Sequence, residues 1–350
     1  MTATVVEQKP AHNDTRGQSK ISEIMHRPGL LQNVVLMGVL IVIAIVFEIL
    51  NPNYLTNASL RAITLAVAPI GVMSAGQTLV VLLGALDISV GAQAGVASCI
   101  SAMAFTAWNG ILGAAGGSLA AVLVTVALGI VIGALNGVII VYGRINPIVA
   151  TLGGLALYKG VAQVITNGRP VGFVAATPFF QAIGSGTFLW LPIAAWIFIV
   201  VAVLFWVFLN RTDMGRNVYA VGGNDMAARL AGINTNKYII AAYVVVGICG
   251  AIAGIMYTAK TGSGSPNVAT AGYELQTVTA VALGGAVMTG GKGGIGSTVI
   301  AVILVGALNV GLTSVNVSIF WQNIAQGLML IAAVIIQKAR SGERRIGLPT

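Results

Sequence analysis

The sequence predicts an all-α fold, a polytopic transmembrane bundle of about ten helices with a short or broken eighth segment. Three observations support it: 57% of the 350 residues are hydrophobic, only 8% are charged, and the mean hydropathy is +0.93. A soluble domain carries roughly 25% charged residues on its surface. Lipid must therefore surround most of this chain. Because backbone groups in lipid need internal partners, the long apolar runs are expected to be helices.

Apolar segments long enough to cross a bilayer follow one another along the chain. About 20 helical residues span the roughly 30 Å of hydrocarbon, and the first run is too long for the apolar core of a signal peptide. The eighth segment is short and flanked by glycine, so we expect it to be broken or re-entrant. The segments are Leu31 to Leu50, Ile63 to Leu83, Ile88 to Trp108, Gly117 to Tyr142, Pro147 to Thr166, Leu191 to Leu209, Tyr238 to Thr258, Leu275 to Met288, Ile295 to Leu312 and Ile319 to Ile336.

The basic residues predict the orientation. With alternating spans and a cytoplasmic N-terminus, most of the 18 Lys and Arg residues fall on the inner side, as the positive-inside rule requires. Both termini are therefore expected in the cytoplasm, with an N-terminal arm at 1–30, a transmembrane domain at 31–337 that includes a cytoplasmic loop at 210–237, and a tail at 338–350. The inner residues are Lys9, Arg16, Lys20, Arg27, Arg144, Arg211, Arg216, Arg229, Lys237, Lys292, Lys338, Arg340, Arg344 and Arg345.

Charge and cysteine content exclude several other classes. The net charge of +9 lies in short interhelical loops without exposed aromatic residues between the cations, so no nucleic-acid partner is expected. Cys99 and Cys249 lie within apolar stretches and have no CxxC motif or histidine nearby. Neither a metal site nor a structural disulfide is expected from them.

A short internal echo is present in two apolar helices. The run Gly-Ala-Leu-Asn at 133–136 recurs at 306–309, and the two helices should run in opposite senses. This is what an inverted repeat would produce, but a chance match in a chain rich in these residues explains it equally well. The 45 glycines indicate close helix packing, interrupted helices, or both.

The cytoplasmic loop contains its own helical pattern. Asn224 is a good N-cap, Asp225 suits the positive end of the helix dipole, Met226 to Ala231 favour helix and Gly232 suits its end. An exposed apolar face on such a helix would remain in water unless a partner covered it. We expect a docking surface, and the alternative is a solvated linker.

Asp87 follows an apolar helix at a break bounded by glycine. Its carboxylate is placed to accept backbone N–H bonds at the start of the next helix, and we favour this capping role over substrate binding. Uncharged amides, among them Gln77 and Gln163, offer hydrogen bonds without a dense cluster. The candidates for the pathway or its supporting structure are Asp87, Ser89, Gly91, Asn136 and Asn309.

Polar residues near the predicted outer loops are candidates for contact with an external partner. Asn167 and Arg169 end one outer loop, and Glu274 follows a second one rich in glycine, serine and proline. Ordinary interfacial solvation explains all three equally well. Lys159, within the fifth segment, either extends toward the interface or lines the pathway.

Several further motifs follow one another in a defined order along the chain. Residues 84–91 read Gly-Ala-Leu-Asp-Ile-Ser-Val-Gly, 146–153 read Asn-Pro-Ile-Val-Ala-Thr-Leu-Gly, and 166–170 read Thr-Asn-Gly-Arg-Pro. Tyr-Glu-Leu at 273–275 leads to Gly-Gly-Lys-Gly at 290–293. With the cytoplasmic loop, these motifs resemble the permease subunits of bacterial ATP-binding-cassette (ABC) importers for monosaccharides, the ribose, xylose and galactose group. Ala85 stands where a second glycine is usual, and Ala231 where serine is frequent.

The resemblance implies a division of labour in a bacterial inner membrane. This multi-pass chain would translocate a monosaccharide, commonly as a homodimer, with an extracytoplasmic sugar-binding protein delivering it. The chain has no GxxxxGK[ST] motif, so it is expected to need no cofactor itself and to rely on a cytoplasmic ATP-binding subunit. That ATPase would bind the loop through Arg216, Asn224, Ala227, Ala228, Arg229 and Gly232.

Two other readings stay open. One is an ion-coupled secondary transporter, although Glu48, Asp87 and Glu274 all fall at predicted helix ends, which argues against a proton or sodium relay. The other is an ABC permease for an amino acid or a nucleoside, against which Asp87 and the 167–170 motif favour sugars. A membrane enzyme is not expected, because no HExxH, GxSxG or paired-carboxylate pattern is present.

Overall fold

The computed structural model describes residues 28–174 and 177–341, and nearly all of its regular structure is helical. The predicted all-α fold is therefore confirmed; within the described residues the strands form only one hairpin of two residues each, β1 (Thr187–Phe188) and β2 (Leu191–Pro192). The helices are α2 (Pro28–Leu50), α3 (Asn57–Leu82), α4 (Val90–Gly143), α5 (Pro147–Thr166), α6 (Pro178–Ser185), α7 (Ile193–Arg211), α8 (Asp213–Gly223), α9 (Asp225–Leu230), α10 (Thr235–Thr261), the 3-10 helix η1 (Pro266–Thr270), α11 (Tyr273–Leu283), α12 (Ile295–Ser314) and α13 (Ile319–Ser341).

Eight described helices are long and apolar enough to cross a membrane. The longest, α4, has 54 residues and would be roughly 80 Å long if straight, far more than one crossing needs. It bends at Gly113, where φ is 69°, and so contains the third and fourth predicted segments. The short eighth segment is α11, with 11 residues. Most of the predicted N-terminal arm and tail lies outside the described residues.

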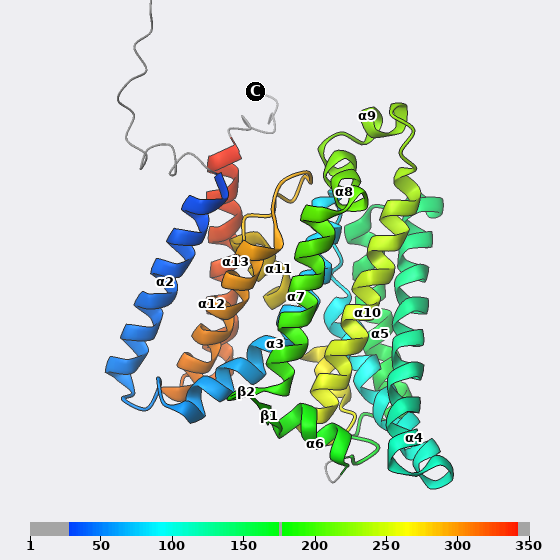
Figure 1. Ribbon diagram of the computed structural model, residues 1–350, viewed down its shortest axis with the longest axis vertical. Helices are drawn as coiled ribbons and strands as arrows, with labels where there is room; N and C mark the ends of the chain where they lie inside the picture. The colour runs from blue at the N-terminus through cyan, green and yellow to red at the C-terminus, as the bar shows by residue number, and fades with distance from the viewer. Residues whose placement is uncertain (1–27, 175–176, 342–350) are drawn as a thin grey trace, which may run out of the picture.

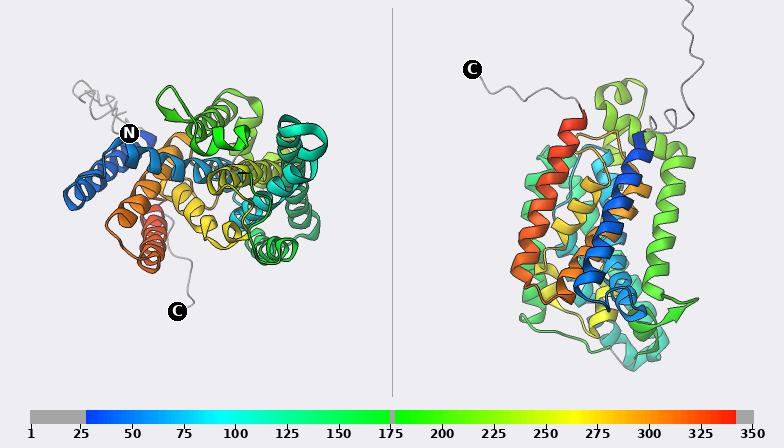
Figure 2. Two further views of the ribbon diagram at one scale, coloured as in Figure 1. Left: turned by 90° about the horizontal axis from the view of Figure 1, so that it is seen from below. Right: turned by 90° about the vertical axis from the view of Figure 1, so that its left-hand side faces the viewer.

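Helices α8 and α9 lie at one end of the bundle, hereafter the α8 end (Figure 1). Helix α2 begins there and α13 ends there, whereas α6 and the β1–β2 hairpin lie at the opposite end, the α6 end (Figures 1 and 2). The α8 end also carries the α4–α5 connection with Arg144 and the α11–α12 loop with Lys292. Of the basic residues in the described loops, Arg144 and Lys292 lie at this end, whereas Arg169 follows α5 at the other.

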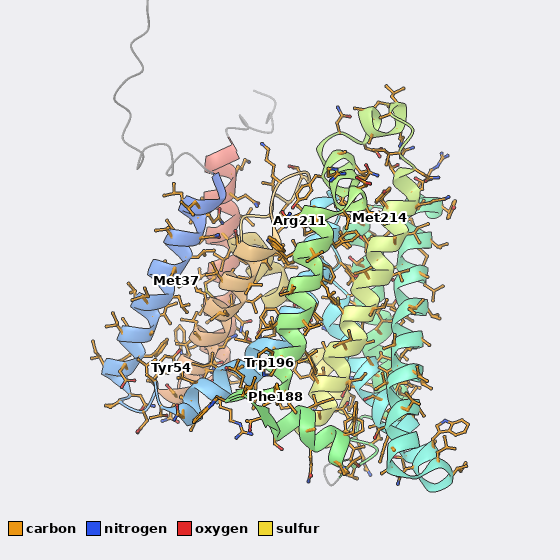
Figure 3. All side chains as sticks on the ribbon, viewed as in Figure 1. Met37, Tyr54, Phe188, Trp196, Arg211 and Met214 are labelled. Carbon is orange, nitrogen blue, oxygen red and sulfur yellow. The ribbon has the colours of Figure 1, made fainter. Side chains whose placement is uncertain are left out.

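The helices form a buried centre and an apolar outer layer. In the most apolar window of α3, 89% of residues are buried, against 11% in α2 and 17% in both α5 and α13. Most large apolar side chains of α2, Met37 among them, project outward, whereas Leu36 and Phe47 are buried (Figure 3). Because the outer helices expose large apolar residues along their lengths, lipid or another apolar surface must cover them.

The centre is packed through close approaches of α4 and α10. Gly133 of α4 faces α10 so closely that a Cβ there would lie 2.7 Å from the Cα of Val244. Small residues at such contacts let membrane helices approach each other. Cys99 and Cys249 are free and buried in the same region, so they pack as small core residues.

Candidate functional site

The helical structure is interrupted between α3 and α4, directly below α8. Asp87 lies within this break, and its side chain is fully buried. Its Oδ1 accepts hydrogen bonds from the Ser89 amide (2.8 Å) and the Ser89 hydroxyl (2.6 Å), and its Oδ2 accepts one from Gln93 Nε2 (2.9 Å). With its amide oriented to satisfy both atoms, Gln77 donates to the Asp87 carbonyl oxygen and accepts from the Asp87 N–H. The Asp87 carboxylate is therefore buried and hydrogen-bonded to the start of α4.

Asn136, in the second half of α4, connects this break to α5. Its Nδ2 donates to Ser89 Oγ (3.1 Å), and its Oδ1 accepts from the hydroxyl of Tyr158 (2.7 Å). Ser89, Asn136 and Tyr158 are all buried, so both bonds form away from water. These bonds hold the start of α4 in a fixed position against its second half and α5, because each buried polar group would be costly to leave unpaired.

Asn309 occupies the corresponding place in the second half of the chain. Its Nδ2 donates to Gln276 Oε1 on α11 (3.3 Å), and its Oδ1 accepts from Gln326 Nε2 on α13 (3.1 Å). Each asparagine thus joins the start of a short or broken helix to the helix that follows its own. The two asparagines end the repeated Gly-Ala-Leu-Asn runs, and α12 runs opposite to the second half of α4 (Figure 1). The two runs therefore lie in helices of opposite direction, as the sequence analysis expects.

Lys159 and Glu274 connect α5 to the start of α11. Lys159 Nζ lies 3.5 Å from Glu274 Oε1, and the side chains are 31% and 7% exposed. Glu274 Oε2 has no hydrogen-bond partner and lies against Gly91, where a Cβ would also be 2.8 Å from the Glu274 backbone nitrogen. The first turns of α4 and α11 therefore meet in the interior, and Gly91 permits that contact.

Glu274 starts the eighth segment, as predicted, but its side chain is buried, which differs from the expectation of contact with an external partner. The segment rich in glycine, serine and proline before it does not stay outside, because η1 descends into the bundle with Pro266, Val268 and Ala269 buried. Its backbone is satisfied by protein groups, such as the paired bonds between Val171 and Gly264. Glu274 is therefore not placed to meet an external partner, whereas Asn167 and Arg169 are exposed at the α6 end of α5.

Beyond the spans, α8 and α9 form a polar platform with exposed apolar side chains. Asn224 accepts from the Ala227 N–H (3.0 Å), Arg229 pairs with Asp225 (3.1 Å), and Gly232 ends the turn with φ of 84°. These are the cap, helix and stop that the sequence predicts. Arg216 is exposed and paired with Asp213 on α8.

The apolar face of this platform differs from the expected one. Ala227 is exposed, but Ala228 faces inward and is buried in the core. The side chains left in the open are Leu230 (84% exposed), Met226 (68%) and Met214 (62%), and Met214 and Arg211 mark the lower edge of the platform in Figure 3. We call Met214, Met226 and Leu230 the exposed apolar triplet.

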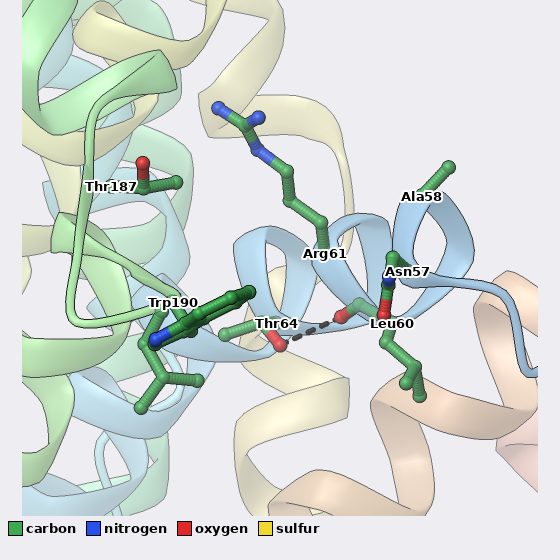
Figure 4. A pocket seen from close by; sticks show the side chains of 8 residues that line it. Asn57, Ala58, Leu60, Arg61, Thr64, Thr187 and Trp190 are labelled. Atoms are coloured by element: carbon green, nitrogen blue, oxygen red, sulfur yellow. Dashed lines mark hydrogen bonds between the residues drawn. The ribbon is translucent and has the colours of Figure 1, made fainter.

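A surface pocket of about 420 Å³ lies at the α6 end, between the first turns of α3 and the β1–β2 hairpin (Figure 4). It is bordered by Arg61, Thr64 and Trp190, and none of the predicted site residues lines it. Arg61 also donates to the carbonyl oxygen of Ser185. Within the part of the chain that the structure describes, no group of three or more His, Cys, Asp or Glu residues could hold a metal ion.

Sequence reasoning missed three groups that complete the site. Gln93 and Tyr158 bond Asp87 and Asn136, and Tyr243 donates to the Leu86 carbonyl oxygen (3.1 Å). A polar residue at helical spacing after Asp87 could have indicated Gln93. The two tyrosines come from distant helices, so no local pattern indicates them.

Comparison with known proteins places these features in context. Residues 59–334 match the family described as branched-chain amino acid transport system / permease component. The chain is 37% identical to the ribose import permease protein RbsC of Escherichia coli (strain K12) over 313 residues, 89% of this chain and 95% of that protein. It is 33% identical to RbsC of Bacillus subtilis (strain 168), covering 91% and 96% of the two chains. It is 31% identical to the L-arabinose ABC transporter permease protein AraH of Azospirillum brasilense, covering 96% and 97%.

Proposed function

This chain belongs to the ABC sugar permease family, and we propose that it is the membrane-spanning subunit of an ATP-driven importer that carries a monosaccharide by alternating access. It lies in a membrane through its apolar helices.

The exposed apolar triplet carries the proposal. Met214, Met226 and Leu230 project from α8 and α9, which are too short and too polar to be spans and lie beyond the bundle. Large apolar side chains exposed on helices that are not spans favour a protein partner, because burying them releases roughly 25 cal/mol per Å². Basic residues at this end favour a cytoplasmic location by the positive-inside rule, and the partner that fits there is the cytoplasmic ATP-binding subunit.

The interior supports transport without a tight solute site. Asp87, Asn136 and Asn309 are already bonded to other protein groups, so these three side chains are not arranged as a dense set of free partners for a sugar. Movement of α8 and α9 by the ATPase would bias the helices between inward-open and outward-open arrangements, a two-state coupling. A second copy of the chain would complete the pathway, and the sugar-binding protein would dock at the α6 end, where Asn167 and Arg169 are exposed.

The names of the relatives indicate the substrate class. They are ribose and L-arabinose permeases, whereas the description of the family refers to branched-chain amino acids. We therefore infer a pentose or a similar monosaccharide, with both termini in the cytoplasm of a bacterium. Uptake of labelled ribose, L-arabinose and leucine by cells with and without this chain separates the two classes, since a leucine deficit alone would reject the sugar.

The docking surface is tested by Leu230→Asp. Placing a charge within the proposed apolar contact should prevent the ATP-binding subunit from copurifying with a tagged permease, because burial of an unpaired carboxylate is costly. Leu189→Asp is the matched control, since Leu189 is also strongly exposed but belongs to the hairpin at the α6 end. Equal recovery of the ATPase with both variants would show that the exposed apolar triplet is not the docking site.

The secondary-transporter alternative draws on one observation, the buried Glu274 carboxylate with an unpartnered oxygen. Liposomes containing the complete transporter distinguish the two mechanisms. We expect sugar accumulation that requires ATP on the side of the ATPase and persists when ion gradients are collapsed. Accumulation driven by a proton or sodium gradient without nucleotide would reject the proposal.

A further inference from the structure

The end of α3 is joined to the loop between α11 and α12 by a backbone hydrogen bond. The amide of Gly291 donates to the carbonyl oxygen of Leu82 at 2.8 Å. Leu82 is the last residue of α3, and carbonyls at a helix end need a partner from elsewhere. The loop from Val287 to Gly293 supplies that partner, although it lies about two hundred residues away in the sequence.

Helix α8 packs against the end of α3 and the Gly291 amide through Gly222. A Cβ at Gly222 would fall on the carbonyl oxygen of Leu82 and lie 2.7 Å from the Gly291 amide nitrogen. Gly290, with φ of 92°, lies beneath it, where a Cβ would be 2.7 Å from the Gly222 carbonyl oxygen and 2.8 Å from the Gly84 nitrogen. The backbones of α8, the end of α3 and the α11–α12 loop therefore touch without side chains between them.

A side chain of α8 adds a further connection to the loop. The hydroxyl of Tyr219 donates to the carbonyl oxygen of Gly293 at 3.0 Å. Burial raises the pKa of Tyr219 above its ordinary value, so the hydroxyl remains a donor at neutral pH. The bond and the backbone contacts hold α8 to the loop at Tyr219 and Gly222, which are about one helical turn apart.

We propose that Gly222, Tyr219 and the Val287–Gly293 loop form a backbone junction that transmits movement of α8 to the Asp87 break. Gly84 lies at the junction and Asp87 follows it by three residues, so a displacement of α8 reaches both the end of α3 and the start of α4. The same loop leads directly into α12, which carries Asn309. Both halves of the inverted arrangement are thus linked to a single helix, and Gly222 is a positioning residue for transport. This inference rests on the proposed function.

Adjacent glycines provide a matched test. Gly222→Ala inserts a methyl group into the junction, whereas Gly223→Ala meets nothing within 4 Å. The experiment measures sugar transported per ATP hydrolysed, in liposomes containing the complete transporter purified from its native host through a tag on this chain, with ribose as the first probe. That ratio does not change when a variant merely lowers the amount of folded protein, because both rates then fall together.

We expect Gly222→Ala to lower this ratio about tenfold, within the usual range for coupling between two sites, while the ATPase still copurifies. Gly223→Ala should match the wild type. A wild-type ratio for Gly222→Ala would overturn the junction. If Gly222→Ala does not assemble, Tyr219→Phe decides: a ratio lowered roughly threefold supports the junction, and an unchanged ratio overturns it. Absence of ATP-dependent uptake in the wild type would instead reject the proposed function.

Discussion

Replacing Asn136 with alanine removes two buried hydrogen bonds at the centre of the bundle. The bond to Ser89 leaves a hydroxyl that still contacts Asp87 and Gln93, so its loss should cost about 1 kcal/mol. The bond from Tyr158 leaves a phenol hydroxyl without a partner, at a cost of about 1 to 3 kcal/mol. Together with the small cavity, we expect Asn136→Ala to lower the free energy of unfolding by about 3 kcal/mol.

A double-mutant cycle isolates the bond between Asn136 and Tyr158. Tyr158→Phe removes only the hydroxyl and leaves the Asn136 carbonyl oxygen unpaired, which should cost about 1 to 2 kcal/mol. Each single variant loses this bond, and the double variant loses it only once. The destabilisation of the double variant should therefore be about 1 to 2 kcal/mol smaller than the sum of the two single effects. Unfolding of the four proteins by SDS titration in mild detergent micelles gives the energies. Additivity within about 0.5 kcal/mol would refute the claim that this bond holds α4 to α5.

Three further predictions concern other contacts. Lys159→Met should lower the free energy of unfolding by about 2 to 3 kcal/mol, less than for a fully buried pair because Lys159 is 31% exposed. Adding Glu274→Gln should recover about half of that loss in the same titration, and no recovery would show that the pair is not coupled. Gly133→Ala should lower the free energy of unfolding by about 3 kcal/mol, because the added methyl group forces α4 away from α10. Gly38→Ala on α2 meets nothing within 4 Å and should change it by no more than about 0.5 kcal/mol, so similar values for both would contradict the close approach. Gln326→Leu should destabilise the second half through Asn309 by about 1 to 2 kcal/mol, and a coupling near zero with Asn309→Ala would show that the two halves are not equivalent.

The spans and the platform were predictable because each depends on local sequence. Apolar runs of membrane length mark the helices whatever surrounds them, and each predicted segment overlaps a described helix, although several ends differ by five or six residues and α4 contains two segments. Asn224, Asp225 and Gly232 act within one short helix, so their capping pattern is readable without knowledge of the fold. The helix α8 was not predicted as a separate element, because its glycines lower its intrinsic helix propensity and its contacts with α3 are distant in sequence.

The interior polar network was only partly predictable, since it joins residues that are far apart in the chain. Composition places the stretch before Glu274 in a loop, and nothing local shows that η1 packs against Gly95 of α4 through Ala269. The exposure of Ala228 was misjudged for a similar reason: α9 is too short for its periodicity to show which face meets the core. The repeated Gly-Ala-Leu-Asn run became meaningful only when the partners of both asparagines were known.

The two thiols packed inside the bundle have a practical consequence. Cys99 and Cys249 are the only cysteines in the sequence, and neither has appreciable contact with solvent. Maleimide and nitroxide reagents should therefore leave the unmodified protein unlabelled, so the native cysteines need not be replaced. A single cysteine introduced at Met226 or at Leu189 would then carry the only probe, and spectroscopy could follow each end of the molecule separately during turnover.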